Sequence, residues 1–277
     1  MTAELGPNRY GKSAIRLVRV DRSDGGHRIR DLTVAIALEG DFAASYVDGD
    51  NSLVVATDTM KNTAYALAAE HLTGAIETYA AALGRHFLED PQVSTVTVSI
   101  DEFAWRPIGS APDAFTRDRT STRTCVVAST RDGVAVDAGI ADLVVMKTSK
   151  SAFSGFPRDE FTTLAETEDR LLATKVSAVW RYLDGVPVDY DASFEAVSRT
   201  LLDVFAEHFS VSVQASIWII GQAIVERHPE VAEITMTFPN LHHWLADIER
   251  FGITNDRQVY VSTTEPHGLI QATVRRG

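Results

Sequence analysis

The chain has 277 residues, of which 45% are hydrophobic and 23% are charged, and its formal net charge is −12. This balance is typical of a globular protein with a large core, and the acidic charge argues against a nucleic-acid-binding protein, which needs a basic surface. The single cysteine, Cys125, excludes an internal disulfide and a cysteine zinc site, and it fits a reducing compartment.

Targeting signals are not apparent in the sequence. No stretch approaches the roughly 20 apolar residues that a membrane helix needs. Residues 1–10 lack the apolar centre of a signal peptide, and residues 274–277 do not form a peroxisomal address. We therefore expect a cytoplasmic protein with no membrane partner.

The first half of the chain alternates strand and helix patterns. Leu32, Val34, Ile36 and Leu38 alternate with other residues, which is typical of a half-buried strand. The patterns predict strands over 13–20, 32–38, 53–56 and 93–100. They predict helices over 62–70 and 73–87, the second with Thr73 as its N-cap.

The second half repeats this plan. Phe194, Val197, Leu201, Val204 and Phe205 share one face of a predicted amphipathic helix. The patterns predict helices over 191–209 and 215–227, and strands over 123–129, 133–140, 143–146, 176–182, 234–238 and 269–274.

The repeated order of elements suggests a duplicated α+β unit within the single chain 1–277. We place the first half at 10–115 and the second at 120–277, joined near residues 110–123. Each half is expected to be an antiparallel sheet with helices on one face. Such sheets leave edges exposed, and closing several chains into a barrel would remove those edges.

Two segments of the first half carry polar residues next to predicted strands. Lys12 follows Tyr10 and Gly11, where a lysine is ordinarily a solvated surface charge. Thr57 and Asp58 follow an apolar run, where small polar residues ordinarily cap the next helix. Backbone N–H groups and hydroxyls at a helix start can also face an anion.

Two further segments lie in the second half. Residues 153–164 read Phe-Ser-Gly-Phe-Pro-Arg-Asp-Glu-Phe-Thr-Thr-Leu and are followed by Asp169 and Arg170, a pattern also typical of a packed loop and a surface ion pair. Val213-Gln214 and Pro-Asn-Leu-His at 239–242 form the last segment. A histidine after a strand is more often structural than catalytic, so each segment alone is compatible with a structural role.

Together these segments resemble the urate oxidase family along residues 10–275. The matching motifs are Tyr-Gly-Lys at 10–12, Val-Val-Ala-Thr-Asp-Thr at 54–59, Lys-Asn-Thr at 61–63, the run 153–164, Asp-Arg at 169–170, Val-Gln at 213–214 and Pro-Asn-Leu-His at 239–242. The chain departs from the family pattern at Ser154, where bulkier residues are usual, and at Leu241, where lysine is common. These departures bear only on pocket details and catalytic efficiency.

The resemblance implies the tunnelling fold, in which two chains close a barrel and two barrels stack into a homotetramer with active sites between subunits. It also implies an oxidoreductase that oxidises urate with molecular oxygen to 5-hydroxyisourate and hydrogen peroxide. Because deprotonated urate passes electrons to oxygen directly, no metal or organic cofactor is expected.

The resemblance further assigns roles to individual residues. A proton relay is implied for Lys12, Thr57 and His242. Phe153 would stack on the purine, while Arg170 and the Gln214 amide would hold its two edges. Backbone N–H groups near Asp58 and Val213 would complete the in-plane contacts. Asn240 and Thr57 would hold oxygen, and later water, above the ring.

Two alternatives stay open. One is a zinc-dependent tunnelling-fold enzyme acting on a pterin or purine, although His242 and His243 are adjacent rather than spaced for one metal. The other is a non-catalytic purine-binding oligomer, which would keep the purine-binding residues but could lose one of the relay residues. All three relay residues are present.

Overall fold

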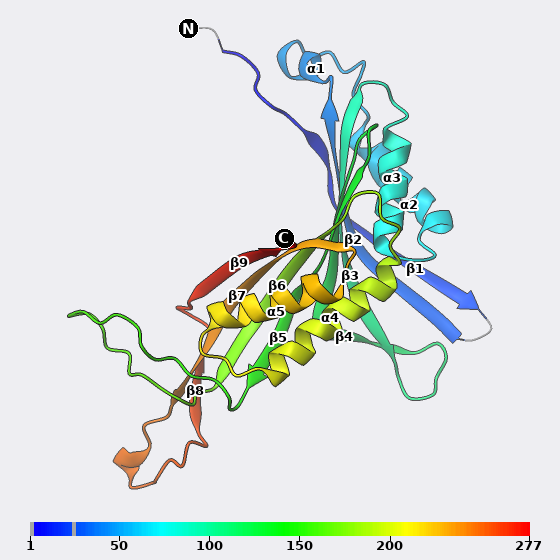
Figure 1. Ribbon diagram of the computed structural model, residues 1–277. Helices are drawn as coiled ribbons and strands as arrows, with labels where there is room; N and C mark the ends of the chain where they lie inside the picture. Colours follow the sequence, from blue (N-terminus) through cyan, green and yellow to red (C-terminus); the bar gives the residue numbers. More distant parts are fainter. Residues whose placement is uncertain (1–2, 24–25) are drawn as a thin grey trace. The chain divides into compact units, whose positions relative to one another are not determined.

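The computed structural model describes residues 3–23 and 26–277, which form two compact units (Figure 1). Unit 1 comprises Met1–Gly139 and Arg181–Phe194, and unit 2 comprises Ile140–Trp180 and Glu195–Gly277. Both units combine antiparallel strands with helices, so the predicted α+β class is confirmed. The duplication of residues 10–115 in 120–277 stays a prediction.

Unit 1 is built on long antiparallel strands that neighbour one another in chain order. They are β1 (Tyr10–Ser23), β2 (Gly26–Gly40), β3 (Val93–Pro107) and β4 (Phe115–Ser129). The alternating residues of β2 predicted above, from Leu32 to Leu38, are all buried, as are Val96, Val98 and Ile100 of β3. One face of this sheet therefore forms the core of the unit.

Three helices accompany these strands: α1 (Ala43–Val47), α2 (Thr57–His71) and α3 (Ile76–Phe87). Figure 1 shows α2 and α3 on one face of the strands, where α3 packs on β3 and β4. Ile76, Tyr79 and Leu83 of α3 and Met60 of α2 are fully buried. Apolar burial of such side chains stabilises the layer by about 1.5–3 kcal/mol each.

Unit 2 is also built on antiparallel strands. Strand β5 (Val134–Lys147) begins in unit 1 and ends in unit 2, and the strand order continues with β6 (Leu172–Tyr182), β7 (Val231–Leu245) and β8 (Tyr260–Thr263), while β9 (Leu269–Arg275) pairs with β7. Its helices are α4 (Tyr190–Glu207), which begins in unit 1, α5 (Val213–Arg227) and a 3-10 turn at Glu249–Phe251.

Close packing holds the helices of unit 2 in place. Four of the five residues predicted on the apolar face of α4 are buried (Val197, Leu201, Val204 and Phe205), and Phe194 is half-buried. A Cβ atom on Gly221 of α5 would lie 2.4 Å from a methyl of Val274, so the approach of α5 to β9 requires glycine. None of the described helices combines the length and apolar character that a membrane span requires.

The prediction of a strand at 53–56 is wrong, because this segment is a turn and an extended connection. The reason is a contact with Tyr10, which lies 45 residues before Val55 in the sequence. The Tyr10 hydroxyl accepts a hydrogen bond from the Val55 N–H at 2.9 Å and lies 3.2 Å from the Val55 carbonyl oxygen, to which it can donate. A side chain thus occupies the backbone groups that a neighbouring strand would pair.

Other boundaries also differ from the predictions: the strands predicted at 13–20, 32–38, 93–100, 123–129 and 176–182 are all longer, and α1 and β8 were not predicted. Helix α3 begins at Ile76 after Ala75, so Thr73 is not its N-cap, and α2 begins at Thr57 rather than at residue 62. The strands predicted at 133–140 and 143–146 are one strand, β5. Asp142 adopts a left-handed backbone conformation (φ 61°) inside it, which accommodates the local irregularity without ending the strand.

Candidate active site

A half-closed cavity of about 520 Å³ lies within unit 2. Its walls come from the loop after β5, the start of α5 and the end of β7. Residues from these three segments are far apart in the sequence, yet the fold places them around one space. The cavity is lined by six of the predicted site residues: Phe153, Arg170, Val213, Gln214, Asn240 and His242.

A loop that closes on itself forms the first wall. The Phe153 N–H donates to the Thr167 carbonyl at 2.7 Å, and the Thr167 N–H donates back at 3.0 Å. Phe153 packs its ring in parallel on Phe156, with centroids 5.0 Å apart. The guanidinium carbon of Arg170 lies 5.2 Å from the Phe153 centroid. An aromatic face and a cation therefore share this wall.

Arg170 is a half-buried cation that forms no ion pair within the described part of the chain. Burial lowers the pKa of its guanidinium, and no carboxylate of residues 3–23 and 26–277 lies within ion-pair distance of it. A desolvated charge is unfavourable unless an opposite charge or hydrogen bonds compensate it. The cavity is therefore suited to an anionic ligand.

The second wall is the start of α5. The Ser212 hydroxyl caps this helix by accepting the Ala215 N–H at 3.1 Å. Val213 is buried and Gln214 is exposed. The first N–H groups of a helix have no intrahelical acceptor, so this end can donate to a ligand. The predicted role of the Val213 backbone is compatible with this position.

The third wall is the end of β7, where alternate residues point to the same side. The Asn240 amide nitrogen lies 3.4 Å from Nδ1 of His242, whose ring stacks on Trp244 with centroids 5.3 Å apart. Burial lowers the pKa of His242, and the positive charges of Arg170 and His267 lower it further. The neutral imidazole, which can accept a proton, is thus favoured near neutral pH.

The remaining predicted residues lie in unit 1. Lys12 is on β1, and Thr57 and Asp58 open α2. The hydrogen bonds between the Tyr10 hydroxyl and Val55 connect the start of β1 to the segment that leads into α2. Gly11 is required here, because a Cβ atom would lie 1.9 Å from the Ile36 carbonyl oxygen. The charge of Lys12 acts on Asp58, which follows Thr57 at the start of α2, so these three predicted residues lie near one another in unit 1.

Thr57 is not the N-cap of α2, so the structural role considered for it above does not apply. Its helix begins after Ala56, which makes no side-chain cap, and the Thr57 hydroxyl makes no hydrogen bond within the described parts of the chain. Asp58 is exposed and pairs with Lys61, whose hydrogen bond lowers the pKa of the carboxyl. The nearby charge of Lys12 acts on Asp58 in the same direction.

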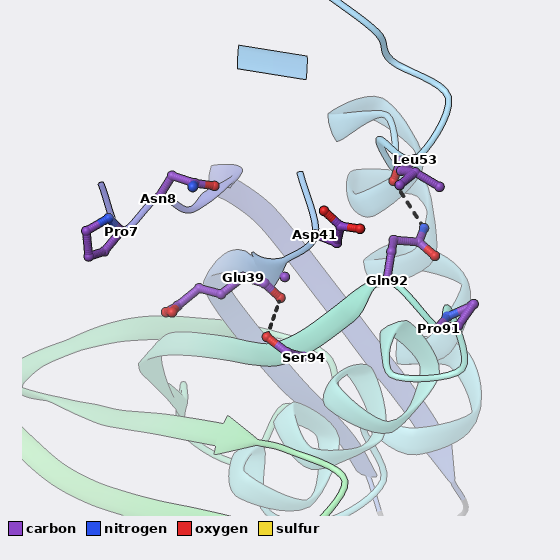
Figure 2. Close-up of a pocket in the computed structure, with 9 residues that line it drawn as sticks. Pro7, Asn8, Glu39, Asp41, Leu53, Pro91, Gln92 and Ser94 are labelled. Carbon is purple, nitrogen blue, oxygen red and sulfur yellow. Dashed lines mark hydrogen bonds between the residues drawn. The ribbon is translucent and has the colours of Figure 1, made fainter. Parts of the chain in front are cut away.

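A larger and more open hollow, of about 820 Å³, lies elsewhere in unit 1 (Figure 2). Its lining includes the carboxylates of Glu39 and Asp41 but no lysine or arginine. The Gln92 amide donates to the Leu53 carbonyl and the Ser94 hydroxyl donates to the Glu39 carbonyl, both at 3.1 Å (Figure 2). This charge is wrong for an anion, so we place the candidate site in the cavity of unit 2.

Some lining residues were not predicted from the sequence. Trp244 follows Asn240 and His242 on the same side of β7, so strand periodicity would have found it. Glu166 and Ile270 carry no such local signal. Ile270 reaches the cavity only because β9 pairs with β7, opposite Phe238.

The fold and the cavity define an antiparallel α+β protein with a cation-bearing, half-closed ligand site. Among the described residues, no three His, Cys, Asp or Glu side chains gather as metal ligands. A family model described as Uricase matches residues 8–128 and 136–271. The chain therefore belongs to the uricase family, a family of oxidoreductase enzymes.

Individual relatives agree with this assignment. The chain is 44% identical to a uricase of Arthrobacter globiformis over 98% of this chain and 90% of that protein. It is 38% identical to a uricase of Dictyostelium discoideum over 99% and 98%. The crystal structure of the Arthrobacter globiformis uricase superposes with a TM-score of 0.96, covering 100% of this chain and 96% of that chain.

Proposed function

We propose that the chain oxidises urate with molecular oxygen and water to 5-hydroxyisourate and hydrogen peroxide, without a metal or an organic cofactor. The observation that carries this proposal is the unpaired, half-buried Arg170 beside the Phe153 ring in a cavity that Gln214 also lines. Urate is flat and anionic, so it matches an aromatic face and a guanidinium that forms no ion pair with the described residues. Relatives named Uricase, up to 44% identical over most of the chain, support the choice of substrate.

In this proposal Phe153 stacks on the urate ring and Arg170 grips an anionic oxygen and a ring nitrogen through two N–H groups. The Gln214 amide offers a donor and an acceptor to the opposite edge. Backbone N–H groups of Val213 and Asp58 complete the in-plane contacts. Asn240 and Thr57 hold oxygen, and then water, above the ring.

Lys12, Thr57 and His242 form the proposed proton relay. Lys12 takes a proton from urate, the Thr57 hydroxyl accepts and donates in turn, and His242 exchanges protons near neutral pH. The urate dianion then gives two electrons to oxygen. Water adds at the oxidised carbon, and the relay returns protons so that oxygen leaves as hydrogen peroxide.

We further propose a cytoplasmic homotetramer with two-chain barrels and active sites between subunits. Lys12 and Thr57 belong to one compact unit and the purine cavity to the other, which is compatible with a site shared by two copies of the chain.

Cofactor independence is tested by chelation. Purified protein treated with EDTA should keep its full rate of urate absorbance loss and release one hydrogen peroxide per urate consumed. A rate that disappears with chelator and returns with zinc, copper or iron would contradict this mechanism. Urate binding without any turnover would instead identify the purine-binding alternative.

A further inference from the structure

Ser151 lies at the base of the cavity wall that carries Arg170, and it has no predicted role. Its side chain is fully buried. The Ser151 hydroxyl accepts a hydrogen bond from Nε of Arg170 at 3.3 Å, and the Ser151 carbonyl accepts the Arg170 N–H at 2.8 Å. One residue therefore holds both the backbone and the side chain of Arg170.

Ser151 accepts a hydrogen bond from Nε of Arg170, and this leaves the other guanidinium nitrogens available to a ligand. A guanidinium has five N–H groups in a rigid planar fork. Because Nε is held by Ser151, the two terminal nitrogens are left for a ligand. They make no hydrogen bond to any residue that the structure describes.

We propose that Ser151 is a positioning residue, whose buried hydroxyl fixes the plane of the Arg170 guanidinium so that its two terminal nitrogens face the anionic edge of the purine. This inference rests on the proposed function and deepens it. A hydroxyl suits the task because it occupies one N–H without neutralising the cation. A carboxylate at this place would form an ion pair and compete with the substrate anion.

The same residue joins two walls of the cavity. Ser151 forms a parallel bridge with Ser210, in which the Ser210 N–H donates to the Lys150 carbonyl at 2.9 Å and the Ala152 N–H donates to the Ser210 carbonyl at 2.8 Å. Ser210 is also fully buried. This backbone ladder ties the wall of Arg170 to the turn that leads into α5.

A hydrogen-bonded serine cluster continues from the bridge into α5. The hydroxyls of Ser210 and Ser216 are 2.8 Å apart, and the Ser216 hydroxyl donates to the Ser212 carbonyl at 3.1 Å. Nε2 of His208 lies 2.8 Å from the Ser216 hydroxyl. The start of α5, which carries Gln214, is thus held relative to Ser151 by a continuous set of buried and partly buried hydrogen bonds.

The consequence is a guanidinium ordered before the ligand arrives. A long side chain that is already fixed loses less conformational entropy on binding than a mobile one. Removing the Ser151 hydroxyl should therefore weaken binding through Arg170 and leave the chemical step almost unchanged.

A double-mutant cycle tests this inference in the full-length chain. Urate affinity is measured by anaerobic calorimetric titration for the wild type, Ser151→Ala, Arg170→Ala and the double variant, with KM and kcat measured in air. Ser151→Ala should raise Kd and KM roughly tenfold, the effect of one hydrogen bond to a charged group, with kcat within about twofold. In the Arg170→Ala background, the same change should alter Kd by less than about twofold.

Ser129→Ala is the matched control, because it removes an equally buried hydroxyl from β4 in unit 1. It should leave Kd unchanged. If Ser151→Ala does not fold, Ser151→Cys offers similar volume with a weaker acceptor and should raise Kd in the same direction.

Two outcomes would overturn the inference: wild-type affinity in a folded Ser151→Ala or Ser151→Cys chain, or an equal loss of affinity with and without Arg170. Either result would leave the proposed function standing. A wild-type chain that binds urate anaerobically but does not oxidise it would overturn the proposed function and leave the role of Ser151 intact.

Discussion

Replacing Arg170 with alanine is expected to weaken urate binding by about 2–5 kcal/mol, because a partly buried charged hydrogen bond to the substrate is lost. Arg170 is the cation of the cavity that has no carboxylate partner in the described residues, so the substrate anion is its natural counterion. Anaerobic titration with urate and the KM in air both measure this loss. Gln214→Ala should act in the same direction on the opposite edge of the purine.

Arg158→Ala is the matched control for this experiment. Arg158 belongs to the same loop and loses the same charge on substitution, but its side chain donates to the Leu164 carbonyl at 3.2 Å and does not line the cavity. Its affinity for urate should stay at the wild-type value. An Arg170→Ala chain with unchanged affinity would show that Arg170 is outside the urate site.

Co-expression of two inactive chains is expected to restore activity. Thr57→Ala removes a relay residue of unit 1, and Arg170→Ala removes a binding residue of unit 2. Each variant alone should have almost no activity at low urate concentration. If sites are shared between subunits, a mixed assembly contains some sites with an intact Thr57 from one chain and an intact Arg170 from another.

Differently tagged chains and tandem purification show whether mixed assemblies have formed. Activity in the doubly tagged fraction, at a substantial part of the wild-type rate per intact site, is the expected result. Mixed assemblies without recovery would show that each site is built within a single chain. The assignment of urate as the substrate would be unaffected.

Local patterns in the sequence predicted the parts of the fold that are held by local burial. The alternation from Leu32 to Leu38 predicted β2, and the helical spacing from Val197 to Phe205 predicted α4, because in both cases one face packs into the core. The segment 53–56 had equally apolar residues but is not a strand. Its backbone is bonded to Tyr10, and no local pattern contains that contact.

In the site, too, local motifs were predicted from the sequence and long-range contacts were not. The motif segments contained all six predicted residues that line the cavity of unit 2, since each motif lies on one wall. Ser151 was not predicted, because its importance depends on contacts with Arg170 and Ser210, which are 19 and 59 residues further along the chain. Such contacts arise only when the loop after β5 meets the start of α5.

The most direct measurement is a crystal structure of the chain with urate, prepared without oxygen so that the substrate is not consumed. We predict a flat ligand in the cavity of unit 2, stacked on Phe153, with the Arg170 fork on one edge and the Gln214 amide on the other. Urate bound anywhere else on the chain, or in this cavity without contact to Arg170, would contradict the account.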